Sequence, residues 1–139
     1  MITDIITAVG EMAIGDTVCR YLDTAKMDVA AGDLPVRIIV PVTEAAGEFV
    51  AIGNLSAIEW RIHDVLLYAA VTQGSGIHQF TSEMATYIEQ YITALKANRV
   101  FATTGVLVGW EFRMGPIAWS SPTPDYWGVD IALVIEEHI

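Results

Sequence analysis

Histidine and cysteine are the residues most suited to catalysis or metal binding, and the chain has few of them. It contains three histidines, His63, His78 and His138, and one cysteine, Cys19. His63 and Asp64 are adjacent on an expected strand, where neighbouring side chains point to opposite faces, so they cannot act together locally. The two glutamates before His138 are not at a recognised metal-ligand spacing. We interpret that segment as a solvated strand end.

Other catalytic patterns are equally weak. Cys19 lies among apolar residues of an expected helix, where a lone cysteine is more often a small buried hydrophobe than a nucleophile. The segment Gly74-Ser75-Gly76 is too short to hold a phosphate and lacks the lysine of a P-loop. A carboxylate pair for glycoside hydrolysis remains open, because its members can come from any loops, yet no residues indicate one. We therefore predict a protein that is not an enzyme and that has no cofactor, metal or catalytic residue.

Composition narrows the class of protein. The chain has 139 residues, 53% of them hydrophobic, and 7 Lys or Arg against 17 Asp or Glu, for a formal net charge of −10. This length predicts one domain over residues 1–139. Seven basic side chains disfavour non-specific nucleic-acid binding, which needs clustered cations. The acidic start Met1-Ile-Thr-Asp4 and the lack of about 20 consecutive apolar residues predict no signal peptide, no membrane association, and synthesis in a cytoplasm.

The acidic residues are concentrated at the two ends of the sequence. The net charge is −4 over residues 1–33, −2 over 34–72, zero over 73–99 and −4 over 100–139. Such a distribution can simply serve solubility. It can also indicate an acidic face that repels nucleic acid or binds a basic partner.

The first part of the chain predicts a helix, a strand and a flap. Apolar residues recur at helical spacing from Ile2 to about Leu22, although Gly10 and Gly15 weaken this helix. The β-branched run Val36–Val40, between two prolines, predicts a short strand. The mixed segment Val42–Leu55 predicts a long loop or flap.

The rest of the chain gives clearer patterns. Residues Ala57–Val71 alternate and then become apolar on both faces, which predicts a strand that enters the core. Phe80–Asn98 predicts a helix with one apolar stripe. Gly105–Trp119 and Tyr126–Ile139 predict a closing hairpin, in which Trp110 and Met114 share one apolar face with Val106, Val108 and Phe112.

The predicted order is therefore helix, strand, strand, helix, strand, strand. It corresponds to a single α+β domain, with an antiparallel or mixed sheet covered by helices on one face. All four tryptophans lie on or beside predicted strands, where they serve either core packing or a subunit contact. As candidate interface residues we selected members of the flap and of the last turn: Glu44, Glu48, Phe49, Trp119, Pro122, Tyr126 and Trp127.

The whole layout resembles the tail terminator, or tail-completion, proteins of long-tailed bacteriophages. The likeness rests on the N-terminal helix, the proline-bounded strand Leu34–Pro41, the flap, the strand Ile58–Leu67, and the long helix followed by a closing hairpin. It implies a homo-oligomeric ring, usually of six subunits, at the head-proximal end of the virion tail. Such a ring stops polymerisation of the tail tube protein and joins the tail to neck and head-completion proteins. It also implies that DNA passes through the channel without specific binding.

Three alternatives remain open from the residues. The chain is also compatible with another neck or tail assembly protein, namely a head–tail stopper or the tube subunit. A small-molecule-binding α+β domain would have a pocket between sheet and helices, lined by Trp60, Tyr68, Tyr91 and Trp110. An acidic adaptor that binds a partner protein is the third.

Overall fold

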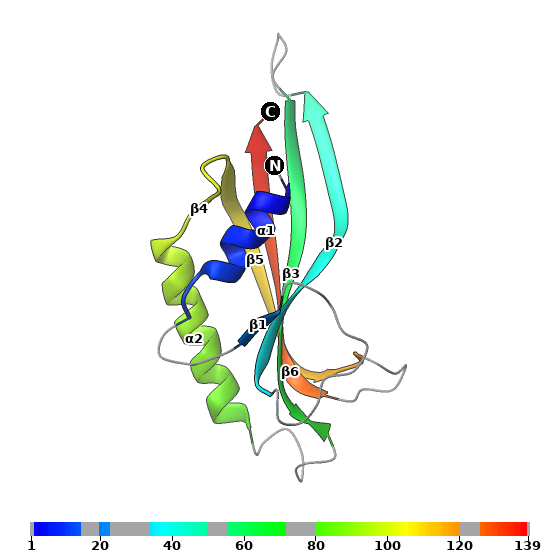
Figure 1. The fold of residues 1–139 in the computed structure, drawn as a ribbon, viewed down its shortest axis with the longest axis vertical. Helices are drawn as coiled ribbons and strands as arrows, with labels where there is room; N and C mark the ends of the chain where they lie inside the picture. The colour runs from blue at the N-terminus through cyan, green and yellow to red at the C-terminus, as the bar shows by residue number, and fades with distance from the viewer. Residues whose placement is uncertain are drawn as a thin grey trace.

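The computed structural model describes residues 2–14, 20–22, 34–49, 56–71, 80–119 and 126–138. The α+β prediction is confirmed, because these residues form two helices and one six-stranded sheet (Figure 1). In chain order the elements are α1 (Ile2–Glu11), β1 (Arg20–Leu22), β2 (Val36–Phe49), β3 (Ser56–Ala70), α2 (Thr81–Ala97), β4 (Val100–Phe101), β5 (Gly105–Ile117) and β6 (Tyr126–His138).

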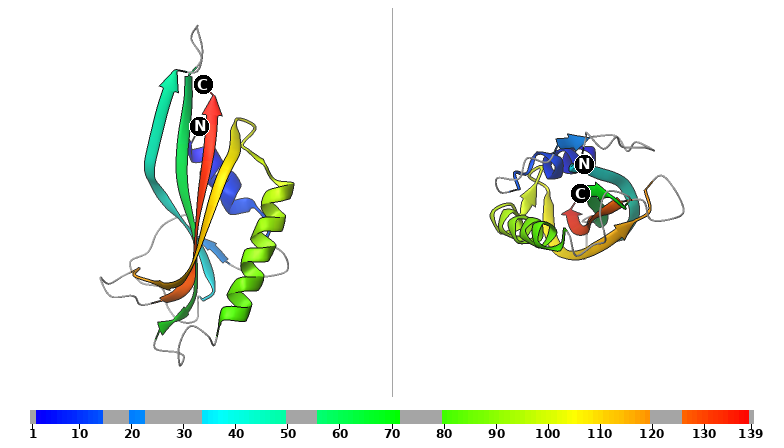
Figure 2. Two further views of the ribbon diagram at one scale, coloured as in Figure 1. Left: turned by 180° about the vertical axis from the view of Figure 1, so that it is seen from behind. Right: turned by 90° about the horizontal axis from the view of Figure 1, so that it is seen from below.

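The strands follow the spatial order β1-β2-β3-β6-β5-β4. The four long strands β2, β3, β6 and β5 are antiparallel to their neighbours, whereas β1 pairs with β2 in parallel. Successive long strands therefore alternate in direction, so β2 and β5 at the two sides of this group run opposite ways. The sheet twists strongly along the long axis of the molecule and curves at its lower end (Figures 1 and 2).

Both helices contribute to one core cluster on the same side of the sheet (Figure 2). The predicted helix over Phe80–Asn98 is confirmed as α2, and its buried residues Met84, Tyr87, Tyr91 and Leu95 recur at helical spacing. They pack with Ile5 and Val9 of α1 and with alternate residues of β3 and β6. Full burial of each such side chain contributes about 1.5–3 kcal/mol, so this face holds the domain together. We call it the helix face.

The opposite side of the sheet, the open face, carries a smaller apolar cluster at one end. It consists of Val36, Ile38, Val65, Leu67 and Tyr126, with Leu34, Ala70, Ile117 and Trp119 packed against it. This cluster explains why the second half of β3 is apolar on both faces, as the sequence pattern predicted.

The prediction of one helix from Ile2 to Leu22 is wrong in its second half. Helix α1 ends at Glu11, and Arg20–Leu22 forms β1 beside Val36–Ile38. Gly10 lowers the helix propensity near this end. The Arg37 side chain also donates hydrogen bonds to the carbonyls of Met12 and Val9 at this end of the helix, and the Val9 carbonyl accepts a further one from Met12 N.

The predicted flap over Val42–Leu55 is also wrong for most of its length. Strand β2 continues to Phe49 and pairs with β3 until Phe49 faces Ser56. Its register with β3 shifts between Val40 and Glu44, next to Pro41, where a proline is tolerated at a strand irregularity. Residues 50–55 lie outside the described part. The two-residue strand β4 was not predicted.

Candidate interaction surface at the β5 edge

Arg37 and Asp64 form an ion pair inside the core. The Arg37 Nη2 atom lies 2.7 Å from Asp64 Oδ2, and Nε lies 3.4 Å from Oδ1. Tyr91 donates its hydroxyl to Asp64 Oδ2 over 2.6 Å. Arg37 also donates to the carbonyl oxygens of Met12 and Val9, at 3.0 and 3.1 Å. The network joins α1, β2, β3 and α2.

Electrostatic interactions within this network determine the protonation states of Arg37 and Tyr91. Burial by itself would lower the pKa of Arg37, but the Asp64 carboxylate raises that pKa above its ordinary value. Burial, together with the same carboxylate, raises the pKa of Tyr91 well above its ordinary value. Arg37 therefore stays protonated and Tyr91 stays neutral. Because Asp64 has no exposed surface, the arrangement positions elements of the fold and offers no open site.

Alternation in β3 already carried a signal for this pair. Asp64 has the same parity as Ile58, Trp60 and Ile62, the apolar side of the strand, so its side chain enters the core. Sequence reasoning assigned the other parity, that of His63, to the charged side. A carboxylate that enters the core needs a cation as partner, and Arg37, within the apolar run Val36–Val40, is that cation.

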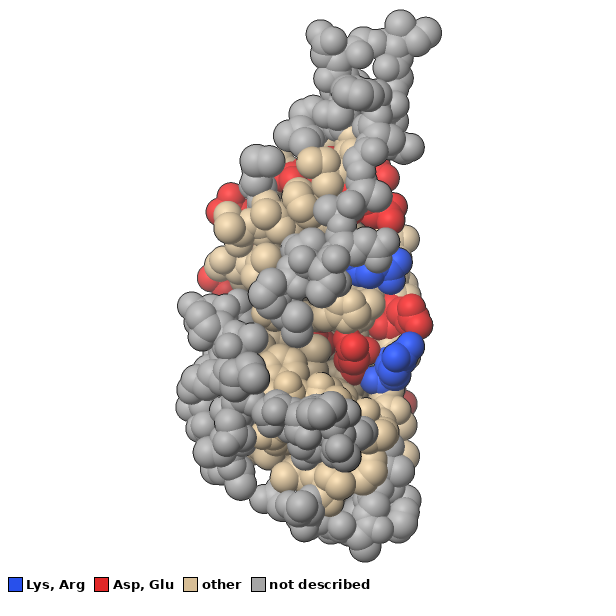
Figure 3. Space-filling model, turned by 90° about the vertical axis from the view of Figure 1, so that its right-hand side faces the viewer, with Lys and Arg blue, Asp and Glu red and all other residues tan. Residues whose placement is uncertain are grey.

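Charged side chains gather on the open face of the sheet, along one border of the molecule (Figure 3). A shallow hollow of about 210 Å³ lies among them, lined by Arg61, His63, Glu111, Arg113, Asp130 and Ala132. His63 Nδ1 lies 2.8 Å from Asp130 Oδ1. This surface mixes both signs of charge, which suits contact with another protein surface better than binding of a single ion.

Among the strand residues whose burial the structure describes, those of β5 are the most exposed. Its pairing with β4 covers only Gly105 and Val106, and a hydrogen bond from Leu107 N to Arg99 O extends that cover by one residue. Beyond Leu107, no strand of the described part pairs with the outer side of β5. In the end-on view of Figure 2 this segment lies on the rim of the molecule. We call residues 108–117 the β5 edge.

Large apolar side chains are exposed on and beside this edge. Exposed fractions are 53% for Val108, 50% for Trp110 and 37% for Met114, while Val106 and Val100 nearby are 44% and 54% exposed. An exposed edge strand with apolar side chains is a template for pairing with another chain. These are the exposed large hydrophobic residues of the described part, so this edge is the best candidate interaction surface.

The single apolar face predicted for this strand is wrong. A register shift between Leu107 and Gly109 changes the faces, so that Val106 pairs with Glu136 of the open face whereas Trp110 pairs with Leu133 of the helix face. Sequence reasoning therefore missed that these residues are exposed. Gly109 within the strand was the available signal, because an isolated glycine in a strand often marks a bulge.

The structure separates the interface residues selected from the sequence. Glu44, Glu48 and Phe49 lie in the far half of β2, where their backbone pairs with β3. Trp119 and Tyr126 pack in the open-face cluster, and Tyr126 is only 5% exposed, so intramolecular packing accounts for Tyr126. Trp127 is half-buried, and its Nε1 has no hydrogen-bond partner among the described residues. Pro122 lies outside the described part.

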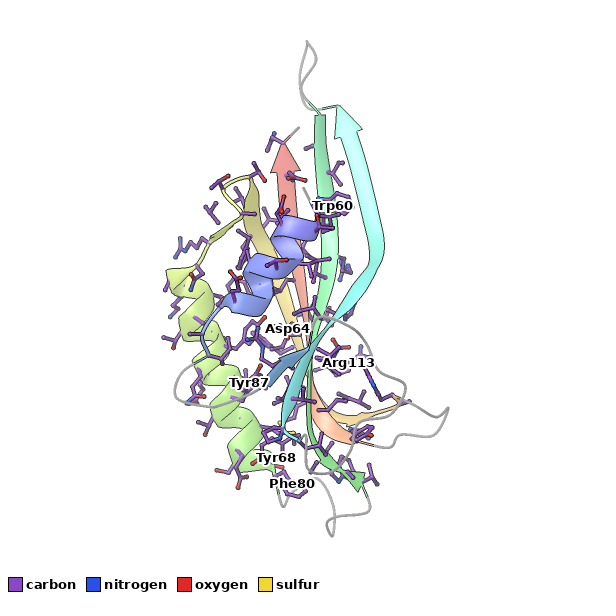
Figure 4. The ribbon with its side chains drawn as sticks, viewed as in Figure 1. Trp60, Asp64, Tyr68, Phe80, Tyr87 and Arg113 are labelled. Atoms are coloured by element: carbon purple, nitrogen blue, oxygen red, sulfur yellow. The ribbon has the colours of Figure 1, made fainter. Side chains whose placement is uncertain are left out.

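The aromatic pocket suggested for a small-molecule ligand does not form. Trp60 and Tyr68 lie near opposite ends of β3 (Figure 4), and Trp60 Nε1 donates to Glu137 over 3.2 Å. Tyr91 is buried, and Trp110 lies on the β5 edge. A hollow of about 280 Å³ beside the start of α2 contains only one of the four, and its lining residues are Leu66, Tyr68, Ser82, Glu83, Thr86 and Tyr87.

His63 and His138 lie in two separate side-chain pairs. His63 pairs with Asp130, and His138 Nε2 lies 2.8 Å from Glu136 Oε1. Among the described residues, no three His, Cys, Asp or Glu side chains come together in a way that would hold a metal ion. Cys19, His78 and the segment 74–76 lie outside the described part.

Comparison with known proteins adds no family to these observations. No helix of the described part has the length and apolar character needed to cross a membrane. Neither a protein-family model nor a curated protein matches the chain.

Proposed function

We propose that the chain is a structural protein of a long-tailed phage, a tail terminator that forms a ring at the head-proximal end of the tail tube. The ring stops tube polymerisation and joins the tail to the neck proteins. The exposed β5 edge carries this proposal. Val108, Trp110 and Met114 are exposed to water there, and contact with another protein chain would bury them.

The direction of the strands supports a ring. Strands β2 and β5 flank the group of long strands and run opposite ways, so the β5 edge of one copy can lie antiparallel to β2 of the next. Such a contact joins two different surfaces of each subunit, which is the kind of interface that forms a ring when its rotation closes. The side of β2 beyond Ile38 has no paired strand among the described residues, since β1 covers only Val36–Ile38.

The charge of the chain supports passage of DNA without retention. The formal net charge is −10, and one of the seven basic side chains, Arg37, is buried in the core. Each contact between a basic side chain and a phosphate adds affinity. A channel formed by an acidic chain therefore holds DNA weakly.

Native mass spectrometry at two protein concentrations tests the assembly. We expect a species of about six subunits at the higher concentration or on added tube tips. Trp110→Lys should abolish it by placing a charge in the contact, whereas the exposed Thr93→Lys on α2 serves as a matched control. A monomer at both concentrations, without binding to tube tips, would contradict the proposal.

Electron microscopy of phage particles made without the protein separates the tail proteins. Loss of a terminator should leave tails of irregular length, because nothing stops tube growth. Loss of a tube subunit should leave no tails, and loss of a head–tail stopper should leave tails of normal length that do not join heads. Either of the last two results would replace the terminator proposal.

A further inference from the structure

The β5 edge carries two opposite charges on one face. Glu111 and Arg113 are two residues apart in β5, so both point to the open face. Both are exposed, and Arg113 lies opposite Asp130 of β6. On the other face of the same segment, Trp110 and Met114 are exposed on either side of Phe112.

This arrangement is self-complementary about Phe112. We infer that two copies of the free protein pair their β5 edges antiparallel, with the two-fold axis at Phe112. In this register Glu111 of each copy faces Arg113 of the partner copy, and Trp110 faces Met114 of the partner copy. The dimer extends the two sheets into one and covers both edges.

Charge selects this register over its neighbours. A shift of one residue in the centre of symmetry places Glu111 against Glu111, or Arg113 against Arg113. Like charges directly opposite each other are destabilising, whereas opposite charges stabilise a cross-strand pair. Only the register centred on Phe112 makes two Glu–Arg pairs.

The apolar residues fit the same register. Trp110 and Met114 lie on the helix face, and their exposure shows that α2 leaves room above this edge. A methionine sulfur beside an aromatic ring adds a favourable contact. The next pairs outward are Gly109 with Gly115 and Val108 with Pro116. Pro116 lacks an N–H group, so it suits the end of the ladder.

The dimer goes beyond the tail function and stands without it. A ring contact made through the β5 edge would have to displace the dimer contact, so the two states exclude each other at that edge. The free protein would thus keep its edge covered until it reaches the tube.

Sedimentation velocity of charge variants tests the pairing. Glu111→Arg and Arg113→Glu should each weaken dimerisation roughly tenfold or more, because each places like charges in both cross-strand pairs. The combined variant Glu111→Arg/Arg113→Glu should restore it. Glu83→Arg, exposed on α2, is the matched control. A double variant no better than the singles would overturn the inference.

Cysteine pairs test the register directly, in a Cys19→Ser background with folding checked by circular dichroism. Mixing Glu111→Cys chains with Arg113→Cys chains should give a disulfide-linked dimer, since opposed Cα atoms in an antiparallel pair lie about 4.5–5.5 Å apart, within the range of a disulfide. Either chain alone should remain unlinked. Linkage of Glu111→Cys alone, or no linkage in the mixture, would overturn the register. A six-subunit ring without any dimer would overturn the inference and leave the tail proposal intact.

Discussion

Arg37 lies 2.7 Å from Asp64 in the core, and the same guanidinium donates to the carbonyl of Val9 in the last turn of α1 and to that of Met12, just beyond the helix. One side chain from β2 thus fixes the position of α1 over the sheet, while Asp64 links β3 to Tyr91 of α2. Transfer of charges from water is costly, so the pair is stable only because these partners are all present. Loss of one member leaves a buried charge without compensation.

Asp64→Asn or Arg37→Met should therefore lower the free energy of unfolding by about 3–5 kcal/mol, measured by urea denaturation. The combined variant Arg37→Met/Asp64→Leu should cost less than the sum, because it removes both charges together. Arg99→Met, an exposed position, should leave unfolding unchanged. Equal effects of Arg99→Met and Arg37→Met would contradict a specific role for the pair.

The raised pKa of Tyr91 predicts that the folded state loses stability at high pH. Its pKa is raised in the folded state, so the stabilising contribution is complete below about pH 10, where an unfolded tyrosine starts to ionise. As the pH rises above that value, the unfolded state releases its proton first and stability falls. Urea denaturation from pH 8 to 11 should show a steeper fall for the natural chain than for Tyr91→Phe. Parallel curves would contradict this origin.

Substitution by alanine should have different effects on stability at Gly128 and at Gly109. A Cβ at Gly128 would overlap the backbone carbonyl of Leu66, and it would also lie 2.9 Å from Ile117 Cδ1. At Gly109 the nearest atom lies 3.9 Å away, an ordinary contact. Gly128→Ala should lower the melting temperature by roughly 10 °C or more, whereas Gly109→Ala should change it little. A similar melting temperature for the two variants would show that the strands can separate here.

Two adjacent glutamates on β6 allow a matched test of burial. Glu137 is buried and accepts hydrogen bonds from Trp60 Nε1 and from Thr104 Oγ1, at 3.2 and 2.8 Å. Glu137→Ala should cost about 1–3 kcal/mol in urea denaturation, because buried donors lose their acceptor. Glu136→Ala should have a small effect, since Glu136 is partly exposed and pairs with the exposed His138. The reverse ranking would contradict the assignment of faces on β6.

Elements whose residues repeat with a strong period were predictable. Helix α2 and strands β3 and β6 match the predicted ranges closely, because one or both faces of each are apolar. The errors fall where local preference is weak and a partner element decides the outcome. Arg20–Leu22 is a strand only because β2 lies beside it, and residues 44–49 are extended because β3 pairs with them.

The candidate surface was predictable only in part. The sequence by itself determined an acidic α+β domain with more apolar residues than an average chain, because composition and side-chain period require no tertiary contact. Which apolar residues remain outside the core was decided by the tertiary structure. The register shift beside Gly109 and the short β4 leave Trp110 and Met114 exposed at the β5 edge. Strand order and register depend on contacts between residues far apart in the chain, and a local signal such as Gly109 marks a bulge without saying which strand lies opposite it.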